Sequence, residues 1–166
     1  LGRTPKMPWP LFDALVDQAN RRRLPVAVHL FYLDDAKYVL RAGGDLIAHS
    51  VRDLPVDAEF MSLLRDTGVC YIPTLTREVS TFIYESVPSF WGDNYFKREA
   101  DPAVLEQLTS PERMERTASS SMAQGYKVAL EVALENVDTL ARDGLPVAMG
   151  TDSGPPARFQ GYFEHL

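Results

Sequence analysis

Three side chains that can bind metal ions or move protons lie just after short apolar runs of the sequence. His29 and His49 each come directly after a run of three apolar residues, and Asp152 comes shortly after a similar run at 146–149. Neutral imidazole and carboxylate are ordinary ligands of zinc and related divalent ions. Beside such an ion, a carboxylate can accept the proton of a water molecule that attacks a carbonyl group. The three residues therefore predict a metal-dependent hydrolytic site, provided that the fold brings them together.

Each of these residues also has an ordinary structural explanation. A single histidine after an apolar strand is more often a hydrogen-bonded core or rim residue than a ligand, and this applies to both His29 and His49. Asp152 lies within Thr-Asp-Ser-Gly, where its carboxylate can cap the following turn. The functional hypothesis depends on all three side chains lying at one edge of a sheet.

The elements that would position these residues alternate between helical patterns and short apolar runs. Apolar residues recur with helical spacing in four stretches, and a run typical of a buried strand follows each one. Since parallel neighbours need a crossover of this size, the alternation predicts βα units and a parallel sheet, with the three side chains at the carboxyl ends of the strands. The predicted helices are 11–23, 34–42, 57–66 and 111–142, and the predicted strands are 26–28, 46–48, 69–72 and 146–149.

Four such units fit half of an eight-stranded barrel, so the predicted fold class is α/β, as a partial (β/α)₈ TIM barrel. A doubly wound open sheet is the competing architecture, but no Gly-x-Gly-x-x-Gly turn follows any predicted strand. Residues 77–110 are rich in aromatic residues and proline without a clear period. We interpret the aromatic excursion within them, residues 82–96, as a lid over a substrate, a layer on neighbouring helices or a subunit contact.

Composition argues against several classes of function. A chain of 166 residues that is 45% hydrophobic can bury a core, and its net charge of −6 opposes binding to nucleic acid or anionic membranes. We interpret the basic cluster 21–23 as favourable charge at the end of a helix. No apolar run is long enough to predict a membrane-spanning helix. The single cysteine, Cys70, excludes an intramolecular disulfide and a cysteine-rich zinc site.

The residues around the three side chains resemble motifs of the amidohydrolase superfamily, in particular imidazolonepropionases and Xaa-Pro dipeptidases. Residues 26–29 resemble its fifth-strand motif, 45–50 its sixth and 149–154 its eighth, while 71–75 lies where the seventh strand belongs. The order and the separations match over nearly the whole chain. Each motif alone is weak, whereas three in register are fairly specific.

This resemblance implies a metal-dependent hydrolase of C–N bonds in amides, peptides or cyclic amides, with one or two divalent ions, zinc being favoured. It implies that His29, His49 and Asp152 are metal ligands. By the same resemblance, Asp152 is the general base that later hands the proton to the leaving amine. His49 either binds the metal or orients the attacking water, and is predicted to be catalytic as well.

The chain departs from the superfamily pattern in two ways. The His-x-His pair of the first strand and the lysine of the fourth strand are missing, and Lys6 lies in a proline-rich loop and is not given that role. Residues 1–6 have neither an initiator methionine nor a signal-peptide pattern, which we interpret as an internal cut. We therefore expect residues 1–166 to be the C-terminal portion of one barrel domain, truncated at both ends and inactive alone. The compartment is undetermined, with a cytoplasmic location favoured.

Tyr71, Thr74 and His165 are predicted to bind substrate. Tyr71 and Thr74 lie at or beyond the end of the third predicted strand, and His165 follows a Gly-x-x-x-His turn that lies near the rim in similar enzymes. Aromatic and β-branched residues are also ordinary core material, and His165 can equally be a surface residue. The expected partner is a small amide or dipeptide, not nucleic acid or membrane, and a homo-oligomer is left open.

Two alternative functions remain from the sequence. The first is a non-catalytic half-barrel that binds a partner or assembles with copies of itself, since a half-barrel leaves strand edges open. The second is another metal-dependent barrel enzyme, such as a deaminase or a phosphotriesterase-like hydrolase. Pocket residues distinguish these enzymes, and a single sequence does not identify them.

Overall fold

The computed structural model describes residues 5–154, which form two compact units. We call residues 5–73 and 131–149 the sheet unit, and residues 74–130 and 150–154 the helical unit. Each has its own cluster of buried hydrophobic side chains. Helix α8, Ser121–Arg142, contributes its first part to the helical unit and the remainder to the sheet unit.

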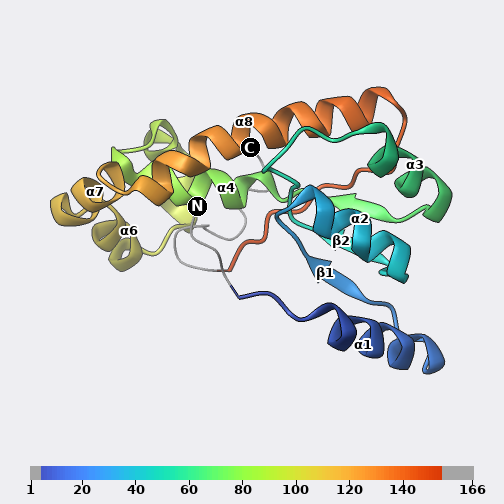
Figure 1. The fold of residues 1–166 in the computed structure, drawn as a ribbon. Helices are drawn as coiled ribbons and strands as arrows, with labels where there is room; N and C mark the ends of the chain where they lie inside the picture. The colour runs from blue at the N-terminus through green and yellow to red at the C-terminus, as the bar shows by residue number, and fades with distance from the viewer. Residues whose placement is uncertain (1–4, 155–166) are drawn as a thin grey trace. The chain divides into compact units, whose positions relative to one another are not determined.

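The sheet unit contains a parallel sheet of three short strands (Figure 1). The strands pair in chain order, with Val28 opposite Ile47 and Ile47 opposite Tyr71. Because parallel strands need a crossover between them, a helix precedes each strand, as the sequence predicts. The α/β class with a parallel sheet is confirmed. The strands are β1 Ala27–His29, β2 Leu46–Ala48 and β3 Cys70–Ile72.

The fourth predicted strand, 146–149, is reduced to one parallel bridge between Tyr71 and Val147. Tyr71 donates its N–H to the carbonyl oxygen of Pro146 at 3.0 Å, and Ala148 donates to the carbonyl oxygen of Tyr71 at 2.9 Å. The run therefore lies beside β3 as expected, but its pairing ends at Ala148. The predicted strand is correct in place and wrong in length.

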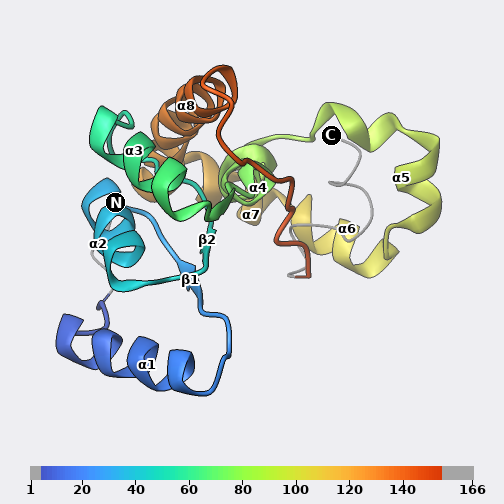
Figure 2. The same ribbon diagram turned by 90° about the vertical axis from the view of Figure 1, so that its right-hand side faces the viewer.

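Three helices of the sheet unit form one layer beside the strands, in chain order (Figure 2). Each turns an apolar face to the core, and glycines in the left-handed conformation end two of them, Gly43 with φ of 92° and Gly68 with φ of 65°. The helices are α1 Trp9–Arg21, α2 Leu33–Ala42 and α3 Ala58–Thr67. The buried core includes Phe12, Val16, Val39, Ile47, Phe60, Leu64, Tyr71 and Leu140.

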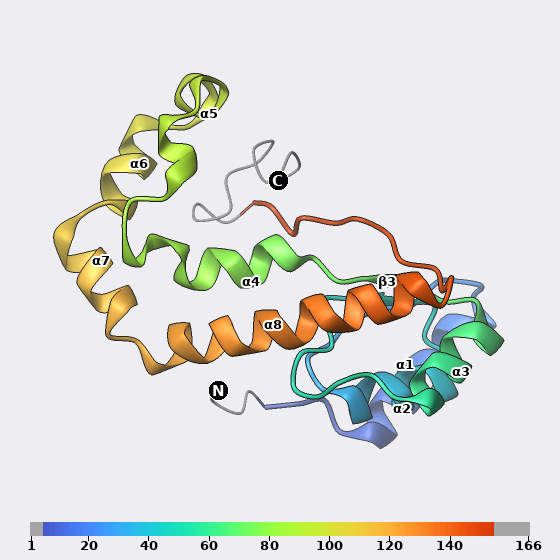
Figure 3. The same ribbon diagram turned by 90° about the horizontal axis from the view of Figure 1, so that it is seen from above.

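The aromatic segment after residue 74 forms a series of short helices (Figure 3). Aspartates begin two of them, since Asp93 accepts the N–H of Phe96 at 3.0 Å and Asp101 that of Ala103 at 2.9 Å. The cluster formed by Tyr84, Phe96 and Leu108 is buried at their centre. The elements are α4 Leu75–Phe82, η1 Ile83–Glu85, η2 Ser89–Gly92, α5 Asn94–Glu99, α6 Pro102–Leu108 and α7 Pro111–Ala118.

The prediction of one helix over 111–142 is wrong, because α7 ends at Ala118 and α8 begins at Ser121. The hydroxyl of Ser120 accepts the N–H of Ala123 at 3.2 Å, the contact expected of a residue that begins a helix. Serine side chains compete with the helical main chain for such hydrogen bonds and favour a break. Among residues 5–154, none of the helices combines the length and apolarity needed to cross a membrane.

Candidate functional site

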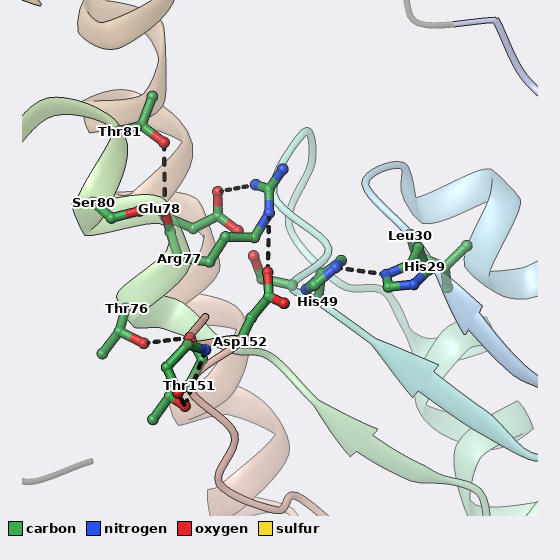
Figure 4. Close-up of polar contacts among 12 residues, drawn as sticks. His29, Leu30, His49, Thr76, Arg77, Glu78, Ser80, Thr81, Thr151 and Asp152 are labelled. Carbon is green, nitrogen blue, oxygen red and sulfur yellow. Dashed lines mark hydrogen bonds and ion pairs between the residues drawn. The ribbon is translucent and has the colours of Figure 1, made fainter. Parts of the chain in front are cut away.

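The imidazoles of His29 and His49 lie against each other in the sheet unit (Figure 4). Nδ1 of His29 is 2.7 Å from Nε2 of His49, and the ring centroids are 4.7 Å apart. His29 is the last residue of β1, whereas His49 follows the last residue of β2. The expectation that neighbouring parallel strands bring the two histidines together is therefore correct.

The backbone of His49 adopts a conformation that residues other than glycine rarely adopt. Its φ is 76°, in the left-handed region, directly after β2. Its N–H donates to the carbonyl oxygen of Ile72 at 2.8 Å, so the residue stays tied to β3 while the chain turns. His49 is also 8% exposed, so a buried imidazole is held at a strained position. Such strain persists where the surrounding structure fixes it, and it concentrates at functional sites.

The facing nitrogens of His29 and His49 would fit one divalent metal ion if the two rings moved slightly apart. Two ligands of one tetrahedral zinc ion, each about 2.0–2.1 Å from the metal, lie about 3.3 Å apart. The nitrogens of His29 and His49 are 2.7 Å apart, the distance of a shared hydrogen bond. A hydrogen bond places a proton on one of these two nitrogens. That imidazole would have to carry its proton on its other ring nitrogen, and the pair would have to open by about 0.6 Å, for both lone pairs to face an ion.

Asp152 belongs to the helical unit, where Arg77 is its ion-pair partner (Figure 4). Nε of Arg77 lies 3.7 Å from Oδ2 of Asp152, and Nη1 of the same arginine donates to Oε2 of Glu78 at 3.0 Å. Glu78 is fully buried, and Asp152 is about one third exposed. The guanidinium thus links a buried carboxylate with a carboxylate that solvent reaches.

Asp152 also has a left-handed backbone, with φ of 51°. The hydroxyl of Thr76 donates to the carbonyl oxygen of Thr151 at 2.9 Å and holds the preceding residue to the start of α4. The hydroxyls of Thr151 and Ser153 lie 2.9 Å apart. Hydroxyl contacts therefore stabilise the turn, whereas the capping interpretation of Thr-Asp-Ser-Gly assigned this role to the carboxylate of Asp152, whose described partner is Arg77.

His29 and His49 lie in one unit and Asp152 in the other, so the common site of the three residues stays a prediction. Within the part of the chain that the structure describes, no group of three or more His, Cys, Asp or Glu side chains is arranged to hold a metal ion.

The residues predicted to bind substrate have different surroundings. Tyr71 is fully buried in β3, and its hydroxyl accepts the N–H of Val51 at 2.7 Å. Thr74 is 6% exposed, has φ of 45° and precedes α4. His165 lies outside the described residues. The substrate-binding role of the three residues remains a prediction.

Arg77 and Arg52 were not singled out from the sequence, although both lie close to predicted strand ends. Arg77 comes three residues after Thr74, and Arg52 three residues after His49. The strand-end rule selected residues directly or shortly after the strands and did not reach these arginines, which lie four and five residues beyond the predicted strand ends. Glu78 carried no signal, because a glutamate in a helical stretch is ordinarily exposed.

The chain is similar in structure to solved amidohydrolase-superfamily proteins. It matches a Xaa-Pro dipeptidase with a TM-score of 0.54 and 24% identity over 92% of this chain and 30% of that protein. It matches a bottromycin amidohydrolase with a TM-score of 0.57 and 23% identity, covering 92% and 37%. For the ochratoxinase of A. niger the TM-score is 0.57 and the identity 14%, covering 91% and 27%.

These likenesses confirm the predicted resemblance to the amidohydrolase superfamily at the level of the fold. The chain spans roughly a third of the length of the solved proteins it matches. No family model matches the sequence, and no curated protein matches it.

Proposed function

We propose that residues 1–166 are the C-terminal portion of a (β/α)₈ barrel that hydrolyses C–N bonds with the help of a divalent metal ion. The observation that carries the proposal is the imidazole pair of His29 and His49, whose facing nitrogens are 2.7 Å apart at the ends of adjacent parallel strands. Active sites of such barrels lie at the carboxyl ends of the strands. The likeness to amidohydrolases supports the same assignment.

In this proposal, His29 and His49 hold the ion, with Asp152 as a further ligand. Zinc is the favoured ion, since imidazole and carboxylate are its common ligands and it activates water near neutral pH. The neutral imidazoles offer nitrogen lone pairs, so the pair must give up its shared hydrogen bond when the ion binds. The remaining ligands would come from residues outside this chain.

Asp152 is proposed to move the proton. Its carboxylate accepts a proton from the attacking water and later gives that proton to the nitrogen of the leaving amine. The guanidinium of Arg77 lies beside one oxygen of this carboxylate, 3.7 Å from Oδ2. About one third of the Asp152 side chain is exposed, so water reaches it.

The expected substrates are small amides or dipeptides, including Xaa-Pro dipeptides. The test uses the complete protein that carries this chain, assayed for hydrolysis of a dipeptide panel before and after chelation of metal. We expect chelation to abolish the activity and added Zn²⁺ to restore it. Full activity of the metal-free protein would contradict the proposal, and release of ammonia from an aminated heterocycle alone would indicate a deaminase instead.

The substitution Asp152→Asn tests the proton-transfer role. We expect kcat to fall by about 10²–10⁴-fold, the range for loss of a general base, while KM changes little. Asp143→Asn is the matched control, because Asp143 forms a surface ion pair with Arg65 and has no part in the proposed chemistry. Equal activity of the two variants would overturn the assignment of Asp152.

A further inference from the structure

The side chain of Arg52 contacts the main chain of the residues that directly follow both histidines. Its Nη1 donates to the carbonyl oxygen of Ser50 at 2.7 Å and to that of Leu30 at 3.3 Å. Ser50 directly follows His49, and Leu30 directly follows His29. One guanidinium nitrogen therefore holds the residue after each imidazole.

Phe31 and the main chain of Arg52 fix the position of this guanidinium. The cation lies over the ring of Phe31, 4.3 Å from the ring centroid, and the N–H of Arg52 donates to the carbonyl oxygen of Phe31 at 3.1 Å. Arg52 is only 4% exposed. A planar guanidinium can lie flat on a ring while one of its nitrogens binds two carbonyl groups, whereas the ammonium of a lysine has no plane to stack.

Surface arginines of the sheet unit are held differently. Arg41 pairs with Glu59 and Arg65 with Asp143, and about half of each arginine side chain is exposed. Such surface ion pairs contribute little to the free energy of unfolding, and they hold no other part of the chain in place. Arg52 instead joins two loops through their carbonyl groups in a buried place.

We propose that Arg52 is a positioning residue. It fixes the distance between the imidazoles of His29 and His49 by binding the carbonyl group of the residue that follows each histidine. Other contacts also hold these loops, since Leu30 donates its N–H to the carbonyl oxygen of Ala48 at 3.0 Å and Asp53 accepts the N–H of Leu33 at 2.9 Å. Nη1 of Arg52 differs from them in binding the residues that directly follow both histidines. The inference deepens the proposed function and rests on it for the identity of what the histidines bind. The hydrogen bond between the imidazoles can be tested without any metal.

The first experiment measures the nitrogen–nitrogen scalar coupling across the hydrogen bond between His29 and His49 in the ¹⁵N-labelled, metal-free chain, with all variants compared at the same pH. We expect the coupling in the natural chain, its loss in Arg52→Met, and a reduced value in Arg52→Lys. Arg65→Met, which removes an exposed arginine, should leave it unchanged. Leu64→Ala should also leave it unchanged, because this variant destabilises the core at a residue outside both loops.

If Arg52→Met does not fold, Arg52→Lys and Phe31→Leu carry the test. An unchanged coupling in the folded variants overturns the proposal, and so does the absence of the coupling from the natural chain. Loss of the coupling in Leu64→Ala as well would reduce Arg52 to an ordinary stabilising residue and would also overturn it.

The second experiment titrates Co²⁺ into the complete protein and follows its absorption bands. We expect Arg52→Met to weaken Co²⁺ binding by about 10–100-fold, the usual effect of losing a group that orients a metal ligand. If Arg52→Met loses the coupling but the natural protein binds no Co²⁺, the positioning role of Arg52 stands and the metal function is rejected. Coupling and affinity both unchanged in Arg52→Met would reject the positioning role alone.

Discussion

The loop after β2, residues 49–57, and the loop that carries Asp152, residues 150–154, are held in different ways. Side chains from distant parts of the sheet unit fix the first loop. Asn136 on α8 donates to the carbonyl oxygens of Val51 and Leu54, each at 3.0 Å, and accepts the N–H of Val56 at 2.8 Å. Asn136 is 1% exposed, so water does not compete for these hydrogen bonds.

The second loop depends on short hydroxyl contacts and on a long ion pair. Thr76 and Ser153 supply the hydroxyl contacts, and Arg77 lies 3.7 Å from Asp152. The comparison indicates that buried side chains of the core fix the histidine loop, whereas the contacts described for the aspartate loop are made by part-exposed polar groups.

The substitution with the largest expected effect on this comparison is Asn136→Ala. It leaves one buried carbonyl group, one part-buried carbonyl group and one part-buried N–H without their partner, which should lower the free energy of unfolding by about 3 kcal/mol. Urea denaturation measures the change. A loss below about 1 kcal/mol would mean that water replaces the amide and that the first loop is less fixed than the contacts imply.

Tyr71→Phe should have the next largest effect. It removes only the hydroxyl that accepts the N–H of Val51, a residue with no exposed surface. We expect the free energy of unfolding to fall by about 1–2 kcal/mol and the amide hydrogen of Val51 to exchange faster. Unchanged exchange at Val51 would show that the loop holds without this contact.

Asp57 is the last residue of the first loop and the N-cap of α3. As the N-cap it should contribute about 1 kcal/mol to the free energy of unfolding. Its side chain accepts the N–H of Phe60 at 3.0 Å and also binds Lys37 at 2.5 Å. Asp57→Ala loses both interactions, whereas Asp57→Asn keeps the helix contact and loses the charge. Thermal unfolding of the two variants separates these contributions, and equal losses would mean that the cap adds nothing.

The charged part of this contribution should depend on pH. The hydrogen bond from Lys37 holds the pKa of Asp57 below its usual value. Since a carboxyl with a lowered folded-state pKa stabilises the protein above its unfolded-state pKa of about 4, the advantage over Asp57→Asn should be complete at neutral pH. It should shrink as the pH falls from about 4 through the lowered folded-state value. A constant difference down to low pH would contradict the ion pair.

The smallest expected effect is that of Thr76→Val in the helical unit. It removes one half-buried hydrogen bond to Thr151, which should cost about 0.5–1 kcal/mol and increase hydrogen exchange only near Asp152. A global loss as large as that of Asn136→Ala would break the contrast between the two loops.

Sequence patterns predicted the regular parts of the sheet unit because its helices are amphipathic and its turns use glycine. Gly43 and Gly68 end α2 and α3 where the pattern places them. The patterns failed where side-chain hydrogen bonds decide the outcome. Ser120 breaks a helix that apolar periodicity continues, and the helices of the aromatic segment begin at aspartates whose signal the aromatic residues obscured.

The candidate site was predictable in its main residues but not in its supporting contacts. The strand-end rule placed His29 beside His49, because parallel strands in register bring equivalent ends together. The role of Arg52 was not predictable, since its partners are carbonyl groups, which every residue carries. The pairing of Arg77 with Asp152 joins residues 75 positions apart and likewise needs coordinates.

The left-handed backbones of His49, Thr74 and Asp152 bear on how this sequence would respond to selection. Glycine adopts that conformation at the lowest cost, and asparagine, aspartate and histidine tolerate it better than a β-branched residue such as threonine does. A library randomised at these positions and screened for heat resistance alone would be drawn toward glycine, most strongly at position 74. The same library screened for catalysis should return to the natural residues, so the two screens together would separate strain that serves the reaction from strain that serves nothing.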